Sequence, residues 1–523
     1  MDGREHVRRY QAATPSYDSP SVYVLDRAVY RINPDMSTVR VVHQIVHVLT
    51  QEAVGPMSEF VVPRGGEVLT LRTIKADGTV LEPLDFDAEG TTNLTGVEVG
   101  DFVEWEYVTW GGPSTVYPGG LVAPRFYFST PDTAMHLSEL IVLAPEGVEP
   151  SFVARGPGPP RGQPVRLGGL AGMRFVAERV PSQVREPDMP SPNEVFPSIG
   201  AMIGESPEAA VASWHDALLM SMRPDFRMRE VVRSLREAGQ TEVELARRLY
   251  GYVLEHVQHG RGSPSASHTL AAGRGNALIL YAALLRIAGL EPEIVYAWSV
   301  AADRSGAYMV PSELANALIL VTLDDEVHWL RLGNRHTPFG HLPASIRGQP
   351  ALVSGAEPRR LTVPESSPVP DLVEVRVGGS VEADGSVVVE LAERYLGARA
   401  AELRRDVSRI PEAERGQRGA AMLGSQYPGG MAEAVRFSCV DDRDAPMEVH
   451  GRLTSRMLGR REGGELMLSA RLANLVRYSR LARLSERRTT LVFDAELREV
   501  VEQRLTLPAG ARVEQPCVCL LYT

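Results

Sequence analysis

Alternating apolar and polar residues dominate the chain from Val22 to Val148. A clear example is Val39–Val48, in which β-branched residues recur between polar ones. Turn residues separate such runs, and Asp77-Gly78 is a typical two-residue hairpin turn. Period-two alternation between turns predicts antiparallel strands. We therefore expect residues 21–180 to form an N-terminal β-sandwich and residues 1–20 to form a tail.

The pattern changes after a proline-rich stretch at residues 181–204, which we interpret as a connector. Ser206-Pro207-Glu208 predicts a helix start, because serine caps helices and proline suits the first turn. The nearly all-apolar segment from Asn276 to Ala288 predicts a buried helix, and strand-like runs follow it. Helices followed by an antiparallel sheet predict an α+β core, which we place at residues 205–352.

A second proline-rich connector is expected at residues 353–370. Beyond it, runs such as Val387-Val388-Val389 predict strands, so residues 371–523 form a β-rich C-terminal domain. The expected fold class is therefore multidomain, with β domains on both sides of an α+β core.

Charge and hydropathy exclude some classes of function. The chain has 55 basic and 66 acidic residues, so its net charge is −11. An acidic chain without a basic face is not expected to bind nucleic acid. No run approaches the ~18 apolar residues of a membrane span, and the N-terminus lacks a secretory signal. We expect a cytoplasmic protein, or a protein of the cell envelope if the chain is a piece of a longer exported one.

Cysteine usage narrows the chemistry further. The three cysteines are Cys439, Cys517 and Cys519, so a disulfide framework is not expected. The last two are too close in sequence for the usual zinc pair, and no second pair completes four ligands. We expect neither a metal nor a cofactor.

Five motifs, taken in order, resemble those of the bacterial transglutaminase-like proteins that have an N-terminal β domain, a papain-like core and a C-terminal β domain. The motifs are Arg72–Val80, Gly100–Tyr107, Ala282–Leu290, Pro338–Pro343 and Arg487–Phe493, the last followed by Leu507-Pro508-Ala509-Gly510. In the family, further strands follow this last motif. The resemblance therefore implies that the C-terminal domain is truncated or is completed by another chain.

The resemblance also implies where a catalytic Cys-His-Asp triad would lie. In such a triad a thiolate at a helix N-terminus attacks, a histidine takes the proton, and an aspartate orients the histidine. This chain has Arg274 at the cysteine position, Ala317 at the histidine position and Arg331 at the aspartate position. Alanine is no base, and arginine can replace neither a nucleophile nor a carboxylate.

The resemblance thus implies a pseudoenzyme that acts as a binding or assembly module through its degenerate cleft or its β domains, with a protein or peptide partner. The oligomeric state stays open. Arg274 and Arg331 would share the cleft, where like charges require compensation. Either acids such as Asp303 or Glu313 pair with them, which we favour, or the two arginines bind an external anion.

A second hypothesis makes the protein a hydrolase or acyltransferase. Ser263, Ser265 and Ser267 precede His268, so a serine nucleophile with a histidine base is conceivable, although loop serines are more often turn residues.

Three other features have both a functional and a structural interpretation. His256 and His259 share a helical face and are candidate metal ligands, but surface or capping roles are favoured. Trp298 and Trp329 are expected to pack in the core rather than stack on a ligand. The arginines between Arg471 and Arg488 form either a solvated face or, less favoured, a site for an anionic partner.

Overall fold

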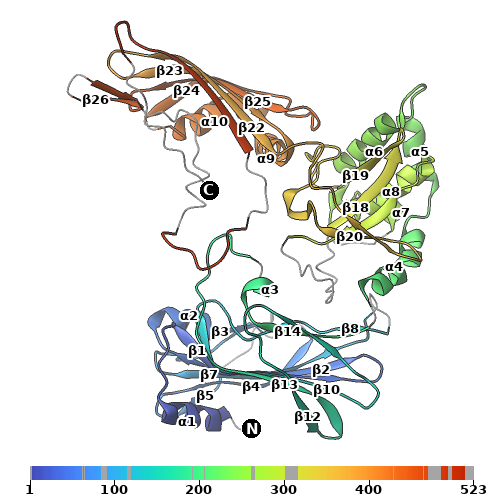
Figure 1. Cartoon of the computed structure of the whole chain (residues 1–523), viewed down its shortest axis with the longest axis vertical. Helices are drawn as coiled ribbons and strands as arrows, with labels where there is room; N and C mark the ends of the chain where they lie inside the picture. The colour runs from blue at the N-terminus through green and yellow to red at the C-terminus, as the bar shows by residue number, and fades with distance from the viewer. Residues whose placement is uncertain are drawn as a thin grey trace.

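The computed structural model describes residues 3–61, 63, 65–83, 91–114, 119–190, 192–204, 206–260, 265–300, 316–427, 429–462, 465–468, 484–492 and 498–512. It shows a multidomain, β-rich protein of mixed α and β structure, which confirms the fold class at that level. In Figure 1 the N-terminal strands lie at the bottom, a helix-rich part lies at the right, and a second large sheet lies at the top.

The N-terminal part is built on an eight-stranded sheet in the order β12-β13-β10-β1-β2-β7-β4-β5. All neighbours are antiparallel except β1 and β10. Its strands are β1 (Ser21–Ile32), β2 (Thr38–Val48), β4 (Gly66–Ile74), β5 (Val80–Leu81), β7 (Phe102–Gly111), β10 (Thr133–Ala144), β12 (Gln163–Leu167) and β13 (Leu170–Val180). The hairpin between β4 and β5 turns at Gly78, whose φ of +90° suits glycine.

A smaller sheet packs against the large one. It contains β8 (Leu121–Val122), β9 (Phe126–Tyr127), β11 (Ser151–Arg155) and β14 (Ser198–Ile203). Phe126, Phe128 and Ile199 from this layer pack on Ala28 and Leu140 of the large sheet. The remaining elements are the strand pair β3 (Glu59–Val61) and β6 (Thr91–Asn93) and the helices α1 (Gly3–Ala13), α2 (Gln51–Ser58) and α3 (Pro192–Val195).

Two expected boundaries are wrong here. Residues 1–20 are not a simple tail, because α1 buries Val7 and Tyr10 against strand residues such as Phe102. Residues 181–204 are not only a connector, because β14 belongs to the smaller sheet. Its residues 198–202 are buried, and the prolines before it concealed the strand.

The central part places helices on one face of a five-stranded antiparallel sheet in the order β19-β18-β17-β20-β21. The helices are α4 (Pro207–Ser221), α5 (Phe226–Leu235), α6 (Glu242–His256), α7 (Ala266–Ala272) and α8 (Ala277–Ile287). The strands are β17 (Glu293–Ala297), β18 (Asn316–Leu323), β19 (Glu326–Leu330), β20 (Pro350–Val353) and β21 (Arg359–Thr362), with a separate short pair, β15 (Gln258–His259) and β16 (Arg274–Gly275), and the 3₁₀ turn Ala344–Ile346.

Local sequence explains this part well. Ser206 caps α4 and Pro207 occupies its first turn, as expected, and nearly every residue of α8 is buried. Along β18, Ile319 and Val321 face the helices, whereas Leu318 and Leu320 face the opposite side. The connector expected at 353–370 is partly wrong, since β21 extends the sheet within it.

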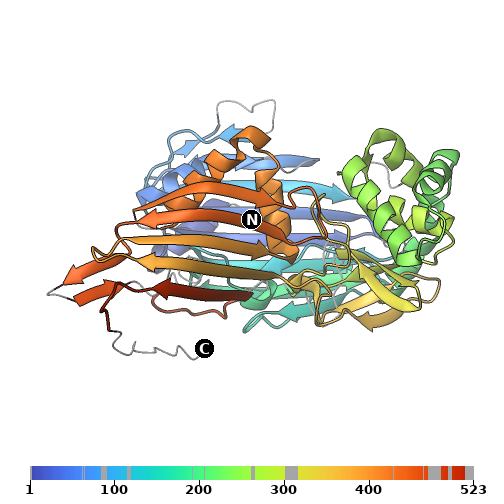
Figure 2. The same ribbon diagram turned by 90° about the horizontal axis from the view of Figure 1, so that it is seen from above.

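The C-terminal part is a five-stranded sheet in the order β24-β25-β23-β22-β28, seen from its open face in Figure 2. Its strands are β22 (Leu372–Val381), β23 (Val387–Tyr395), β24 (Gly430–Ser438), β25 (Met447–Ser455) and β28 (Arg498–Thr506), beside a hairpin of β26 (Gly459–Glu462) and β27 (Glu465–Leu468). Two helices, α9 (Gly397–Val407) and α10 (Glu412–Ser425), were not predicted, although their Ala, Glu and Arg content favours helix.

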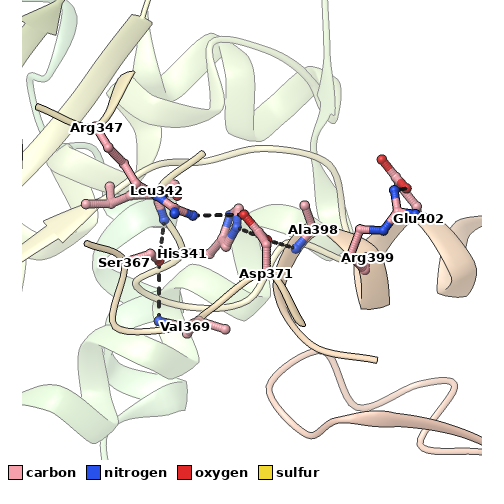
Figure 3. A network of polar contacts seen from close by, with 9 residues as sticks. All are labelled: His341, Leu342, Arg347, Ser367, Val369, Asp371, Ala398, Arg399 and Glu402. Atoms are coloured by element: carbon pink, nitrogen blue, oxygen red, sulfur yellow. Dashed lines mark hydrogen bonds and ion pairs between the residues drawn. The ribbon is translucent and has the colours of Figure 1, made fainter. Parts of the chain in front are cut away.

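A buried polar network joins the central and C-terminal parts (Figure 3). Asp371 accepts hydrogen bonds from His341 Nε2 at 2.8 Å and from Arg347 Nη2 at 2.8 Å. It also accepts one from the Ala398 amide at the start of α9. Burial alone would raise the pKa of Asp371, but these donors hold it below its usual value. The His341 side chain of the motif Pro338–Pro343 therefore links the central part to the C-terminal part.

Within the described ranges, no helix has the length and apolar character needed to cross a bilayer.

Candidate functional site

Two of the three positions expected for a triad, Ala317 and Arg331, lie at one end of the central sheet. Helix α8 is followed by β17, the central strand of the sheet, which ends at Ala297. Ala317, at the start of β18, pairs with Tyr296 at that end. β19 pairs antiparallel with β18, and Arg331 follows its last residue. Ala317 and Arg331 therefore lie at the same end of neighbouring strands, whereas Arg274 lies in the separate short strand β16, just before α8.

The start of α8 is tightly constructed. The Asn276 side chain caps the helix by accepting a hydrogen bond from the Ile279 amide at 3.2 Å. The Asn276 amide donates to Thr269 Oγ1 at 3.2 Å. Gly275 has a φ of +141°, and a Cβ there would lie 2.6 Å from that same hydroxyl oxygen. The backbone at the start of α8, directly after Arg274, is thus fixed by these contacts.

The two arginines differ in their surroundings. Arg274 is exposed, so its long side chain carries its charge into water. Arg331 is half-buried, and burial lowers the pKa of its guanidinium. The Arg331 carbonyl accepts a hydrogen bond at 2.9 Å from the buried Tyr250 hydroxyl of α6, which fixes the backbone there. Ala317 packs against the helix-side core and has no polar group to offer.

The carboxylate partners favoured for these arginines are not found among the described residues, where neither Arg274 nor Arg331 has an ion pair within 4.0 Å. Asp303 and Glu313, named as candidate partners, lie outside the described residues.

The serine-histidine alternative lies close by, at the start of α7. Ser263 lies outside the described residues. The Ser265 hydroxyl caps α7 by accepting from the His268 amide, and it contacts the Ser267 hydroxyl at 2.9 Å. His268 is exposed, and within the described region its ring makes no hydrogen bond to a serine. A resting nucleophile–base pair is therefore not formed by these side chains.

The remaining candidates have structural surroundings. The His256 ring contacts the Tyr252 carbonyl at 2.8 Å and stacks on the Tyr252 ring, and His259 lies in β15. Trp298 is fully buried and Trp329 is partly buried in the core. Across the described ranges, no group of three or more His, Cys, Asp or Glu could hold a metal ion.

The basic stretch from Arg471 to Arg488 is described only at its end. There, Arg487 lies 3.8 Å from Glu186, which also accepts hydrogen bonds from the Arg488 and Thr489 amides. Hydrogen bonds from Thr489 and the Arg488 amide lower the pKa of Glu186 to about 2. Arg477, Arg480 and Arg483 lie outside the described residues, as do Cys517 and Cys519. Arg487 thus takes part in an internal contact.

One polar group that the sequence patterns did not single out lies in the N-terminal sheet. Asp26 is 4% exposed and occupies an inward position of β1. The available signal was an acid within the otherwise apolar alternation Ser21–Ile32. A buried carboxylate in a strand requires a partner, so its surroundings are considered below.

No protein-family model matches the chain, and no curated protein matches it either. Among solved structures, the crystal structure of a putative protease from Parabacteroides distasonis superimposes with a TM-score of 0.53 at 14% identity. The match covers 83% of this chain and 93% of that one. The two proteins share a fold. The match extends over all three parts of the chain and not only over the central sheet. At 14% identity it shows a shared fold and no shared function.

Proposed function

We propose that this protein is a catalytically inactive, transglutaminase-like protein with a papain-like core, which acts as a binding or assembly module. The observation that carries the proposal is the absence of any cysteine in the first 438 residues. Without a cysteine in the core, no thiolate is available to form a covalent intermediate. The fold that the chain shares with a putative protease supports the assignment of a papain-like core.

The side chains at the three positions support the same proposal. A general base must accept a proton, which the methyl group of Ala317 cannot do. Arg274 and Arg331 are permanently charged donors without a lone pair to attack a carbonyl. What the edge offers instead is positive charge beside a helix N-terminus, an arrangement suited to carboxylate groups of a protein or peptide partner.

The catalytic half of the proposal is tested with purified full-length protein. We expect no incorporation of amines into glutamine-containing proteins and no peptide cleavage, with or without a thiol-alkylating reagent. Turnover that copurifies with the protein and disappears in Ser265→Ala or His268→Ala would instead establish the alternative, a serine hydrolase or acyltransferase.

The binding half is tested by affinity purification from the native organism, with partners identified by mass spectrometry. Arg274→Glu should remove the specific partner, because it reverses the exposed charge at the α8 edge. Arg286→Glu is the matched control, since Arg286 is an exposed arginine near the other end of the same helix. Equal recovery of partners with both variants would exclude this edge as the contact surface and leave the β domains.

A further inference from the structure

The N-terminal β domain contains a cavity of about 210 Å³ between its two layers. Strands β1, β2, β7 and β10 form its floor, and β9 with its flanking residues covers it. Its polar lining residues include Asp26, Arg40, Gln44, Tyr107, Arg125 and Tyr127. A cavity of this composition between two sheets is unusual, because that space normally holds apolar side chains.

A row of hydrogen bonds crosses the floor. The Trp105 indole N–H donates to Gln44 Oε1 at 2.6 Å, and Gln44 Nε2 donates to Asp26 Oδ1 at 2.6 Å. From the other side, the Ser138 hydroxyl donates to Asp26 Oδ2 at 3.0 Å. These residues are direct neighbours in register on β7, β2, β1 and β10. The row holds the Asp26 carboxylate in one orientation.

Among the described residues, no basic side chain lies within 4.0 Å of the Asp26 carboxylate. Its two hydrogen-bond donors, Gln44 and Ser138, are neutral, and a carboxylate has about four acceptor sites, so capacity remains. Burial raises its pKa to about 6, while hydrogen bonds and the charge of Arg40 oppose that rise. The group is therefore mainly ionised at neutral pH, buried, and incompletely neutralised.

The positive charge of the Arg40 guanidinium is likewise incompletely neutralised. Its guanidinium lies over the Tyr30 ring at 5.4 Å, and its buried Nε has no hydrogen-bond partner in the described part of the chain. No ion pair within 4.0 Å joins Arg40 to Asp26 among those residues, although both line the same cavity. A sphere of 210 Å³ is about 7 Å across, so one small molecule can reach both groups.

We propose that this cavity is a binding site for a small zwitterion of the amino-acid class, whose ammonium group binds Asp26 and whose carboxylate binds Arg40. A single-charge ligand would neutralise one of the two groups and leave the other uncompensated. A volume of about 210 Å³ suits a small molecule of this class. The site is separate from the edge of the central sheet, so it does not depend on the proposed function.

The test is calorimetric titration of the full-length protein at neutral pH with L-alanine and 4-aminobutyrate. Propionate and propylamine, which carry one charge each, are the comparison probes. At least one zwitterion should bind saturably, and both single-charge probes should bind at least tenfold more weakly. Asp26→Asn and Arg40→Gln should each weaken the zwitterion at least tenfold. Affinity should also fall as the pH decreases below about 6, because Asp26 then takes up a proton.

Arg31→Gln is the matched control, because Arg31 is an exposed arginine of β1 that does not line the cavity. It should leave the affinity unchanged. Circular dichroism and thermal unfolding check that each variant is folded. Because Arg40 is half-exposed, Arg40→Gln should disturb folding less than Asp26→Asn. The proposal is overturned if neither zwitterion saturates the wild-type protein up to about 10 mM, if propionate binds as tightly as L-alanine, or if both variants bind like wild type.

Discussion

Replacement of Asp26 by asparagine should stabilise the N-terminal domain at neutral pH. The carboxyl group is fully buried, and its pKa is about 6 in the folded protein against 3.8 for an unperturbed group. A folded-state pKa above the unfolded one means that the folded protein holds the proton more tightly. The contribution to stability is therefore complete below about pH 3.8 and is lost as the pH rises through about 6.

The size of the effect follows from that difference. A shift of about two pKa units at ~1.4 kcal/mol per unit corresponds to about 3 kcal/mol at pH 7. Asparagine has nearly the same shape, and its carbonyl oxygen can still accept from Gln44 while its amide donates to the Ser138 hydroxyl. The substitution therefore removes the cost of the buried charge without leaving either neighbour unsatisfied.

Hydrogen–deuterium exchange of the full-length protein is the appropriate assay, because a multidomain chain has no single free energy of unfolding. Peptides from β1, β2 and β10 should exchange about a hundredfold more slowly in Asp26→Asn than in wild type at pH 7, after correction for intrinsic rates. The difference should nearly vanish at pH 4.

Asp35→Asn is the control, since Asp35 lies in an exposed turn where hydrogen bonds from Ser37 lower its pKa. That variant should not slow exchange. The reasoning fails if Asp26→Asn exchanges as fast as wild type at pH 7, or if its advantage is independent of pH.

Two further predictions concern the rest of the chain. Gly275→Ala should destabilise the central domain by about 1 to 3 kcal/mol, because a Cβ there meets the Thr269 hydroxyl at a strained φ. In Gly273→Ala the added Cβ makes only a contact at 3.4 Å, so this variant should cost about 1 kcal/mol. The two variants are compared by the exchange of α8 peptides during urea denaturation, and equal effects would contradict the packing argument. Asp371→Asn should speed exchange about tenfold or more at residues 338–347 and 397–400, since Arg347 loses its counter-charge and His341 loses a carboxylate acceptor. Because the pKa of Asp371 is lowered, the wild-type protein should lose the same protection only as the pH falls below about 3.8. If Asp371→Asn exchanges like the wild type at pH 7, the junction does not depend on this charge.

Much of the architecture could be predicted from local patterns. The alternation in β1, β2 and β7 indicated strands, and Ser206-Pro207 marked the start of α4. The apolar run that forms α8 indicated a buried helix. These signals are local because side-chain periodicity and capping depend on residues within a few positions of one another. They were sufficient for a multidomain, β-rich protein of mixed structure.

The same local patterns misled where packing overrides them. Val7 and Tyr10 make α1 part of the N-terminal domain, yet the first 20 residues looked like a tail. β14 follows a proline-rich stretch and is held by β11, which lies more than 40 residues earlier in the chain. Strand pairing is a non-local interaction, so a short strand can form wherever a partner edge is available.

The absence of cysteine from the first 438 residues was determined by the sequence alone, because folding cannot supply a residue type that the chain lacks. Only the tertiary structure decided that Arg274 is exposed while Arg331 is half-buried, and that Asp26 and Arg40 line one cavity without pairing. The physical reason is that residue type fixes which chemistry is available, whereas the charge state and the partners of a side chain depend on burial and on neighbours brought together from distant strands.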